Sequence, residues 1–514
     1  MLKKIIRVFP YILTVLLRIP PFFEPHTYTD SGIYSAVGIG LNHGDVLYRN
    51  IFDNKPPFIY YLYSYLEKIP LSLTFEYQML SLIATLLTEF FIYKIAKIKF
   101  GEKVAILSTL FFSIFVASAF FEGNVANVEN YFMFFTTLSI YLTLRNDKFK
   151  KSVLYTYLLG VILGLGVMFK VSALLDGFFV IVFFFFIFDR GLLKSRLLET
   201  GLLETSLLDF KSFIKNSWFY GIGVLSPMIV FLLYEFSIHN FKNTINAIFL
   251  YNIPYVSYQA SNRILGFSYF KFTLVLFFIV LISVYFLYKK FKIDINVVTI
   301  FLWFVCDYYA SVISGRGYLH YLLQPLVPFS ILLAYLIFLL IRKNIIYKVI
   351  IVISTAISIY VLLLYFLIYK PYWLIPIQYQ NKVDYYPTFI SYITGQSSKS
   401  QYYHFFKGNN YNNVAKELNT INVKNRRIFV MANYPWLYYE TKAIPDTPYS
   451  DDFMLRNGER TYYNKAYFYL EKHNPYVIVY FNDGLNFVQL FKLIDTQYTL
   501  KKTIEGVQIY IRKN

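Results

Sequence analysis

The chain has 514 residues, of which 57% are hydrophobic and 21% aromatic, and its mean hydropathy is +0.46. Soluble domains do not combine these values with repeated apolar runs of about 20 residues, the length at which a helix spans a bilayer, so the composition indicates a multi-pass membrane protein. The net charge of +19 is explained by Lys and Arg residues that accumulate in cytoplasmic loops. A nucleic-acid partner is not expected, because no basic patch is interleaved with base-stacking aromatic residues on a soluble module.

Cysteine content and glycine patterns exclude further classes. The single cysteine, Cys306, lies in an apolar segment, and its solitary presence excludes an intrachain disulfide and a cysteine-based zinc cluster. The chain lacks the G-x-G-x-x-G and Walker patterns, so the use of a nucleotide sugar is not expected.

The N-terminal segment predicts the first membrane span. It begins with basic residues and continues with apolar ones, as a signal peptide does. However, no cleavage site of small residues precedes the polar stretch that follows. We expect a retained helix over about residues 5–22 with its basic end in the cytoplasm, which places residue 30 on the outer face. Segments 31–43 and 57–69 have helical apolar spacing but are short, and we expect them to lie along the membrane interface.

The other long apolar runs predict further spans, which with the first helix make eleven. Lys and Arg gather in every second connection and are sparse in the others. This positive-inside bias places the N-terminus in the cytoplasm and the C-terminus outside the cell membrane. The further predicted spans are about 74–96, 103–121, 127–144, 153–169, 172–188, 217–237, 269–288, 294–314, 320–341 and 346–369.

A Leu-rich near-repeat, LLETGLLETSLLD, lies within residues 190–215. Its Leu pairs recur every five residues, a spacing that walks around a helix rather than forming one apolar stripe. The segment is therefore either a helix on the inner membrane surface or a low-complexity insertion.

The composition changes near residue 370, where long apolar runs end and Asn, Asp, Pro and Tyr become more frequent. Strand-like and helix-like patterns alternate beyond this point. The predicted strands are 428–432, 476–481 and 507–512, and the predicted helices are 413–421 and 462–472. We expect a transmembrane domain over 1–370, whose external loop 23–73 carries the active site, and a small extracytoplasmic α/β domain over 371–514.

Residues 30–57 form the most informative polar stretch of the chain. They read DSGIYSAVGIGLNHGDVLYRNIFDNKPP and hold Asp30, Asp45 and Asp53 together with one Arg and one Lys. A chain this apolar does not need such an insertion for packing, and polar groups at a membrane often carry function. Composition alone leaves open a solvated loop between two membrane helices.

The spacing within this stretch carries a family resemblance. Asp30 is followed four residues later by Tyr34, and the run Asp53-Asn54-Lys55-Pro56-Pro57 closes the stretch. This arrangement resembles the first external loop of the C-type (GT-C) polyprenyl-phosphate-sugar glycosyltransferases, which include protein O-mannosyltransferases and lipid A aminoarabinose transferases. The second acidic residue of that group's Asp-Glu version is absent, because Ser31 and Gly32 follow Asp30.

The resemblance covers about residues 1–370 and implies a mostly α, multi-pass GT-C fold. It also implies that a sugar moves, with inversion, from a polyprenyl-phosphate-linked donor to a hydroxyl of a protein, lipid or glycan on the outer face. The sugar and the acceptor are not identified by any motif, and no cofactor is implied. Asp30, Asp53 and His320 offer ligands to a divalent metal, but no metal-spacing motif supports one, and no metal is assigned.

Asp30 is the candidate catalytic base of such a reaction. A carboxylate within hydrogen-bond reach of the acceptor hydroxyl can take its proton. The sequence Thr29-Asp30-Ser31 also permits Asp30 to cap a helix N-terminus, and the two roles are compatible.

Three cations are candidates for binding the lipid phosphate. Lys55 lies beside Asp53 and can stabilise the leaving charge, although a lone Lys before Pro-Pro is usually an interfacial anchor. Arg316 lies in SGRGYLHYLLQPLVP and either contacts the phosphate or extends toward lipid headgroups. Lys170 lies between two apolar segments on the outer side, where a charge is costly unless it reaches water or an anion.

The remaining candidates are assigned to binding and orientation. The related enzymes often carry Arg followed by His-Tyr near Arg316, so the resemblance includes His320 and Tyr321 with Tyr34 and Asp53 as substrate- or phosphate-binding residues. Glu122 and Glu129 flank an outer turn and either orient the acceptor or cap the following helix.

Two other function classes stay open. A transporter or flippase of lipid-linked glycans tends to carry charges in the middle of its spans and repeated halves interrupted by Gly or Pro. Here the notable charges gather at the outer ends of helices, and no repeated half is visible. A structural membrane anchor that displays the C-terminal domain would leave residues 30–57 without a role.

The predicted orientation can be tested with single introduced cysteines. An impermeant thiol reagent added to intact cells is expected to label Asn409→Cys but not Lys150→Cys, because only the first lies outside the membrane in this topology. The protein that carries Cys306 alone is the control. Equal labelling at both positions would contradict the topology.

Overall fold

The computed structural model of the chain falls into two compact units. The bundle unit comprises Met1–Ile19, Met79–Phe231 and Val256–Ile375, and the loop unit comprises Pro20–Gln78, Leu232–Tyr255 and Pro376–Asn514. The structure describes residues 2–145, 152–197, 202–253, 263–264, 267–291, 293–316, 318–342, 383–406, 411–452, 455, 460–481 and 487–513.

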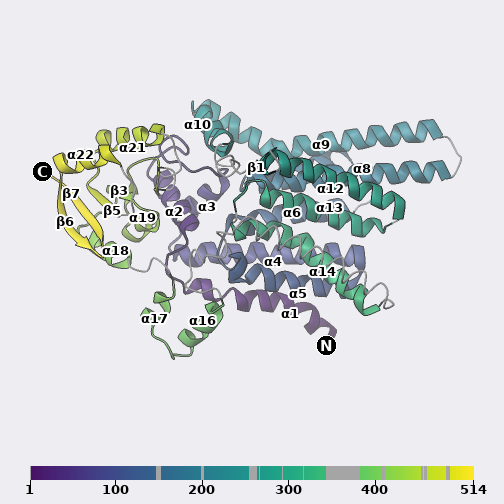
Figure 1. Cartoon of the computed structure of the whole chain (residues 1–514), viewed down its shortest axis with the longest axis horizontal. Helices are drawn as coiled ribbons and strands as arrows, with labels where there is room; N and C mark the ends of the chain where they lie inside the picture. Colours follow the sequence, from purple (N-terminus) through teal and green to yellow (C-terminus); the bar gives the residue numbers. More distant parts are fainter. Residues whose placement is uncertain are drawn as a thin grey trace. The chain divides into compact units, whose positions relative to one another are not determined.

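The bundle unit consists mainly of long helices that lie side by side (Figure 1). Its elements, of which α4 and α9 extend across the unit boundary, are α1 (Leu2–Leu17), α4 (Leu73–Phe100), α5 (Glu102–Ala117), η2 (Ala119–Phe121), α6 (Val128–Arg145), α7 (Val153–Val167), η3 (Val171–Ala173), α8 (Leu174–Leu197), α9 (Leu202–Ser237), β1 (Arg263–Ile264), β2 (Phe267–Ser268), α12 (Tyr269–Phe291), α13 (Ile295–Val312), η5 (Leu319–Leu322) and α14 (Leu323–Arg342). α5 packs against α1 and α14, and α13 packs against α8, α12 and α14. Helices suit these apolar runs because a helix satisfies its backbone hydrogen bonds internally, where lipid offers no partners.

Several described helices are long and apolar enough to cross a membrane. By length and composition there are six of them within the described residues. They are Lys4–Phe22, Leu73–Phe100, Phe210–Ser237, Phe270–Phe291, Ile295–Val312 and Leu319–Ile341, and Val153–Val167 and Val171–Phe186 are shorter apolar helices. The mostly α, multi-pass architecture is confirmed. The number of eleven spans and the orientation of the termini stay predictions, and the span at 346–369 lies outside the described residues.

Buried polar side chains link the first helices of the bundle. The Glu89 carboxylate on α4 accepts hydrogen bonds from Thr14 on α1 at 2.8 Å and from Ser113 on α5 at 2.8 Å. Arg18, which is 1% exposed, donates to Ser81 at 2.6 Å and also to the carbonyl of Gly123. Hydrogen bonds of this kind hold helices together where lipid removes the usual hydrophobic driving force.

Glycines set the close approach of α7 and α9. A Cβ at Gly160 would lie 2.2 Å from the Tyr220 carbonyl oxygen, and a Cβ at Gly223 would lie 2.2 Å from the Tyr157 carbonyl oxygen. Small residues at such crossings let helix backbones approach each other closely. The Leu-rich region 190–215 continues as helix on both sides of 198–201, which lie outside the described residues.

The loop unit joins the first external loop to the C-terminal part of the chain. Its helices are η1 (Pro20–Phe22), α2 (Thr29–Asn42), α3 (Phe58–Leu66), α10 (Phe241–Ile245), η4 (Asn246–Leu250), α16 (Tyr385–Ile393), α17 (Lys399–His404), α18 (Tyr411–Thr420), α19 (Trp436–Thr441), α21 (Arg460–His473) and α22 (Val488–Gln497). The short helices α2 and α3 lie at the segments where sequence spacing predicts interfacial helices. The predicted domain boundary near residue 370 lies outside the described residues.

A five-stranded mixed sheet forms the core of the C-terminal part. Its strands are ordered β4 (Ile444–Pro445), β3 (Arg427–Met431), β5 (Val477–Phe481), β7 (Val507–Arg512) and β6 (Tyr498–Ile504). β3 pairs in parallel with β4 and β5, whereas β7 pairs antiparallel with β5 and β6. Every residue of β5 is buried, as expected for a central apolar strand. β3, β5 and β7 coincide with the predicted strands to within one residue.

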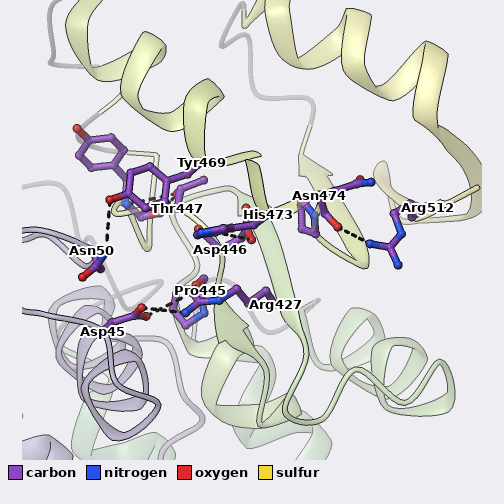
Figure 2. A network of polar contacts seen from close by, with 12 residues as sticks. Asp45, Asn50, Arg427, Pro445, Asp446, Thr447, Tyr469, His473, Asn474 and Arg512 are labelled. Atoms are coloured by element: carbon purple, nitrogen blue, oxygen red, sulfur yellow. Dashed lines mark hydrogen bonds and ion pairs between the residues drawn. The ribbon is translucent and has the colours of Figure 1, made fainter. Parts of the chain in front are cut away.

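The C-terminal part of the loop unit, Pro376–Asn514, contacts the first external loop at several points. The Trp436 indole donates to the Tyr28 carbonyl at 2.8 Å, and a Cβ at Gly32 would lie only 2.8 Å from the Trp436 ring. Figure 2 shows the Arg427 guanidinium on β3 paired with the Asp45 carboxylate at 2.8 Å. The loop is therefore held by C-terminal residues as well as by its own helices.

The glycine contact between α7 and α9 gives a prediction with a matched control. Gly223→Ala is expected to lower the free energy of unfolding by about 1–3 kcal/mol, because the new methyl group must displace a backbone carbonyl. Gly221→Ala lies on the same helix with nothing within 4 Å of its added Cβ, and it should leave stability unchanged or slightly higher. Denaturant or thermal unfolding in detergent measures both, and equal effects would contradict the close contact.

Candidate active site

Asp30 lies in the first turn of α2, and its side chain is partly exposed. The N-cap position is occupied by Tyr28, whose side chain makes no capping hydrogen bond. Tyr34, one helical turn further on, donates its hydroxyl to Asp30 Oδ2 at 3.1 Å. The Lys55 ammonium lies 3.5 Å from the same oxygen and 5.1 Å from the centre of the Tyr34 ring. A negative side chain in this turn is also favoured by the positive end of the helix dipole.

Asp53 holds Lys55 from the opposite side. Its carboxylate accepts the Tyr60 hydroxyl at 2.7 Å and the Asn54 backbone N–H at 2.8 Å, and it lies 3.8 Å from the Lys55 ammonium. The Lys55 backbone is fixed as well, because its N–H donates to the Tyr60 hydroxyl at 3.1 Å and its carbonyl accepts the Tyr48 hydroxyl at 2.8 Å. Asp30, Tyr34, Asp53 and Lys55 are called the loop cluster below.

The charged side chains of the loop cluster differ in how far they are exposed to solvent. The side chains of Asp30 and Lys55 are 29% and 21% exposed, whereas that of Asp53 is 3% exposed. The Asp30 carboxylate and the Lys55 ammonium are therefore open to solvent, whereas the Asp53 carboxylate that pairs with Lys55 is buried. Burial, followed by the charge of Asp53, raises the pKa of Tyr60 well above its usual value, so its phenol stays protonated as a donor.

Two buried aspartates from the C-terminal part also belong to this region, and the sequence patterns did not single them out. Asp451 is 4% exposed and Asp452 is 1% exposed. Burial, and then the negative charges of Asp53, Asp452 and Asp30, raise the pKa of Asp451 well above its usual range. The Asp-Asp pair after Ser450 is visible in the sequence, but only the fold brings it to the first loop.

A second group of polar side chains lies in the bundle unit. Lys170 pairs with the Glu129 carboxylate, and its ammonium lies 3.7 Å from the centre of the Tyr321 ring. His320 Nδ1 lies 2.9 Å from Glu122 Oε2, and the His320 and Tyr321 rings meet edge to face at 4.9 Å. These five residues, the bundle cluster, are Glu122, Glu129, Lys170, His320 and Tyr321.

The bundle cluster is assembled from helix ends. Glu122 follows η2 in a left-handed conformation with φ 56°, and Glu129 lies in the first turn of α6. Lys170 follows α7 and precedes η3, and His320 and Tyr321 lie on η5. Sequence patterns indicate all five residues but do not pair them, because the pairs join segments far apart in the chain.

A hydrogen-bond network connects the turns that carry the bundle cluster. The Gln324 amide at the start of α14 donates to Asp176 Oδ2 at 2.9 Å and reaches the Ser172 carbonyl of η3 at 3.5 Å. The Trp303 indole donates to the other Asp176 oxygen at 2.9 Å. The turn after Lys170 is therefore tied to the helix that follows His320 and Tyr321.

Arg316 lies in the connection between α13 and η5. Its backbone N–H donates to the Ser314 hydroxyl at 3.3 Å, and Gly315 before it has a φ of 65°, which favours glycine. Arg316 belongs to the bundle unit and Asp30 to the loop unit, so their convergence on one substrate stays a prediction. Among the described residues, no group of three or more His, Cys, Asp or Glu is spaced to hold a metal ion.

The ion pair of buried Glu129 with the partly exposed Lys170 generates a testable prediction. Lys170→Met leaves the Glu129 carboxylate, 1% exposed, without its ammonium partner and is expected to lower the free energy of unfolding by about 3–5 kcal/mol. The double variant Glu129→Gln/Lys170→Met removes both charges and should recover most of that loss. Denaturant unfolding in detergent compares the variants, and losses that simply add would argue against a coupled pair.

Comparison with known proteins gives a sequence match and several fold matches. Residues 54–214 match the model of the family described as dolichyl-phosphate-mannose-protein mannosyltransferase. A search of curated protein sequences finds no match. The crystal structure of ArnT from Cupriavidus metallidurans bound to undecaprenyl phosphate aligns over 98% of this chain and 97% of its own, with a TM-score of 0.54 and 11% identity.

A further match has a lower TM-score. The oligosaccharyltransferase AglB from Archaeoglobus fulgidus, in complex with an inhibitory peptide and a dolichol-phosphate, covers 92% of this chain and 68% of its own, with a TM-score of 0.46 and 12% identity. The matched family segment begins within the Asp53-Asn54-Lys55-Pro56-Pro57 run and extends into α9. The likeness to the C-type glycosyltransferases is thus confirmed, by the family match over residues 54–214 and by an ArnT-like fold along nearly the whole chain.

Proposed function

We propose that this protein is a membrane glycosyltransferase that moves a sugar from a polyprenyl-phosphate-linked donor to an acceptor hydroxyl on the outer face of the cell membrane. The observation that carries the proposal is the loop cluster, in which an accessible carboxylate, Asp30, lies 3.5 Å from an accessible ammonium, Lys55. The family match and the fold support this class of reaction. ArnT was crystallised with undecaprenyl phosphate, which supports a lipid phosphate as the leaving group here.

The reaction is a single displacement with inversion at the anomeric carbon. Asp30 takes the proton of the acceptor hydroxyl. The hydroxyl oxygen of the acceptor attacks the anomeric carbon at the same time, from the face opposite the phosphate. The bond between that carbon and the phosphate oxygen breaks, and its electron pair leaves with the polyprenyl phosphate. Lys55 stabilises the charge of the departing phosphate. The Tyr34 hydroxyl, 3.1 Å from Asp30 Oδ2, orients the carboxylate for proton transfer.

The bundle cluster and Arg316 are assigned to the lipid phosphate and the substrates near it. Lys170 and Arg316 provide cations for the phosphate, and His320 and Tyr321 line the same turn as Lys170. Glu129 and Glu122 are both paired with cationic or ionisable partners, so we assign them to orienting Lys170 and His320 rather than to direct acceptor contact. We also propose that the first external loop and the C-terminal α/β part lie outside the membrane, with the N-terminus in the cytoplasm.

Replacing the base gives the central test of this proposal. Asp30→Asn preserves size but cannot accept the proton, so transfer is expected to fall by roughly 10²- to 10⁴-fold. The assay follows release of the lipid phosphate from dolichyl-phosphate mannose or undecaprenyl-phosphate glucose, with membrane extract as the acceptor source. Binding of undecaprenyl phosphate, measured separately, should hardly change, because an anionic phosphate gains nothing from a nearby carboxylate.

Asp45→Asn is the matched control for this experiment. Asp45 is an aspartate of the same loop that pairs with Arg427 at 2.8 Å. Its replacement should reduce stability modestly while leaving the turnover of the folded protein close to normal. Near-normal turnover of Asp30→Asn would remove Asp30 as the base. Loss of folding in Asp30→Asn, with Asp45→Asn intact, would instead indicate a structural role for Asp30.

A further inference from the structure

The C-terminal part of the chain contacts the first external loop through further residues besides Trp436 and Arg427. The Phe52 backbone N–H donates to the Pro448 carbonyl at 2.7 Å, and Phe52 pairs with Tyr449 in a parallel β-bridge. In addition, the helix α16 lies against the residues that directly follow the first apolar helix. This last contact brings a helix of the C-terminal part to the end of a candidate membrane span.

Two side chains just beyond that span hold α16. The span is Lys4–Phe22, so Phe23 and Glu24 are the next two residues. The centre of the Phe23 ring lies 5.6 Å from the centre of the Phe389 ring on α16. The Glu24 carboxylate accepts a hydrogen bond from the Tyr385 hydroxyl at the start of the same helix. Because consecutive Cα atoms are about 3.8 Å apart, α16 lies close to the end of the span.

The beginning of a second candidate span meets the same place. Phe22 is the last residue of the first span, and its ring lies 5.7 Å from the ring of Phe75. Phe75 lies in the first turn of α4, which forms the candidate span Leu73–Phe100. One span ends and the next begins here, so both reach the same membrane surface at this point. The contacts of Phe23 and Glu24 attach α16 to this surface.

Two faces of α16 suit its position in the protein. Tyr385 and Phe389, one helical turn apart, form the buried face that carries the contacts to the first external loop. Thr388 and Ser391 form a polar face, which begins about 100° around the helix from Phe389. The sequence from residue 385 to residue 398 contains no charged side chain. A helix that faces water on its open side usually carries charges there.

The third face of α16 is apolar and exposed. Ile390 and Ile393 are 55% and 56% exposed, and the half-buried Tyr386 lies between them on the helix surface. At about 100° per residue, the three side chains fall within a sector of about 60°. Tyr is enriched where a membrane meets water, and a short helix with an apolar face beside a polar one suits the plane of that interface.

We propose that α16 is an interfacial helix whose Ile390 and Ile393 side chains insert into the boundary between the headgroups and the acyl chains of the membrane lipids. The lipid bilayer, rather than a protein, is the partner of this face, because the helix is attached to the ends of two candidate spans. The insertion ties the C-terminal part of the chain to the membrane surface independently of the sugar-transfer reaction.

Fluorescent labels on single introduced cysteines test this contact in the full chain, reconstituted in nanodiscs of phosphatidylcholine and phosphatidylglycerol. An environment-sensitive label is attached to Ile390→Cys, Ile393→Cys or Val488→Cys, and the protein that carries only the buried Cys306 gives the background. Val488 is the matched control, because it is also an aliphatic residue of a C-terminal helix, 51% exposed, on α22, which lies well away from α16 (Figure 1). The quenchers are a phosphatidylcholine with a nitroxide near the top of its acyl chain, and aqueous iodide.

The two quenchers are expected to give opposite orders. The nitroxide lipid should quench the labels at Ile390 and Ile393 at least about threefold more than the label at Val488, because only the first two lie at the depth of the nitroxide. Iodide should quench the label at Val488 more strongly. A label on Ser391→Cys, about 100° around the helix from Ile390, should be quenched by the nitroxide lipid less than either isoleucine position.

Three results would overturn the proposal. Equal nitroxide quenching at Ile390, Ile393 and Val488 would show that α16 does not contact lipid. Labels at Ile390 and Ile393 that neither quencher reaches would show that protein covers this face. Equal nitroxide quenching at Ser391 and at the two isoleucines would show that this face is not the one that inserts. Two isoleucine positions keep the test available when one labelled variant fails to fold.

Discussion

The buried carboxylate of Asp53 is the constraint on which the first external loop depends. A charge with 3% of its side chain exposed is stable only when donors surround it, and here the Tyr60 hydroxyl, the Asn54 N–H and the Lys55 ammonium supply them. Satisfying Asp53 fixes the position of Lys55, and Lys55 in turn lies against Asp30. The accessible Asp30 carboxylate and Lys55 ammonium are therefore arranged by a residue whose own side chain is almost fully buried. In the bundle unit, the buried Glu129 carboxylate pairs with the Lys170 ammonium.

The candidate site is most predictable from sequence where its residues lie within one short segment. Asp30, Tyr34, Asp53 and Lys55 fall within one loop, and their spacing by itself indicates a common site. The structure brings these four together because α2, α3 and the Asp-Asn-Lys-Pro-Pro turn are local elements. The helical membrane architecture is also predictable, since long apolar runs have few alternatives in a bilayer.

Features that depend on distant segments are not predictable in this way. Glu122 and His320 are 198 residues apart, and a pairing of this kind leaves no periodic signal in one sequence. Asp451 was missed because only the pairing of Phe52 with Tyr449 brings it to the loop. The strand β6 was missed for another reason: Tyr498 is its one fully buried residue and most of the others are exposed, so its sequence, YTLKKTI, resembles a polar surface segment rather than an apolar strand.

The backbone hydrogen bond from Phe52 to Pro448 has a consequence for the order of events during biosynthesis. The two residues are separated by 396 positions, the difference between 448 and 52. At typical translation rates the loop leaves the ribosome about 20 to 80 seconds before its C-terminal partner exists. Throughout that interval Trp436 and Arg427 are not there to meet Gly32 and Asp45. The nascent chain therefore carries the first external loop without these contacts until residues 427–448 have been synthesised.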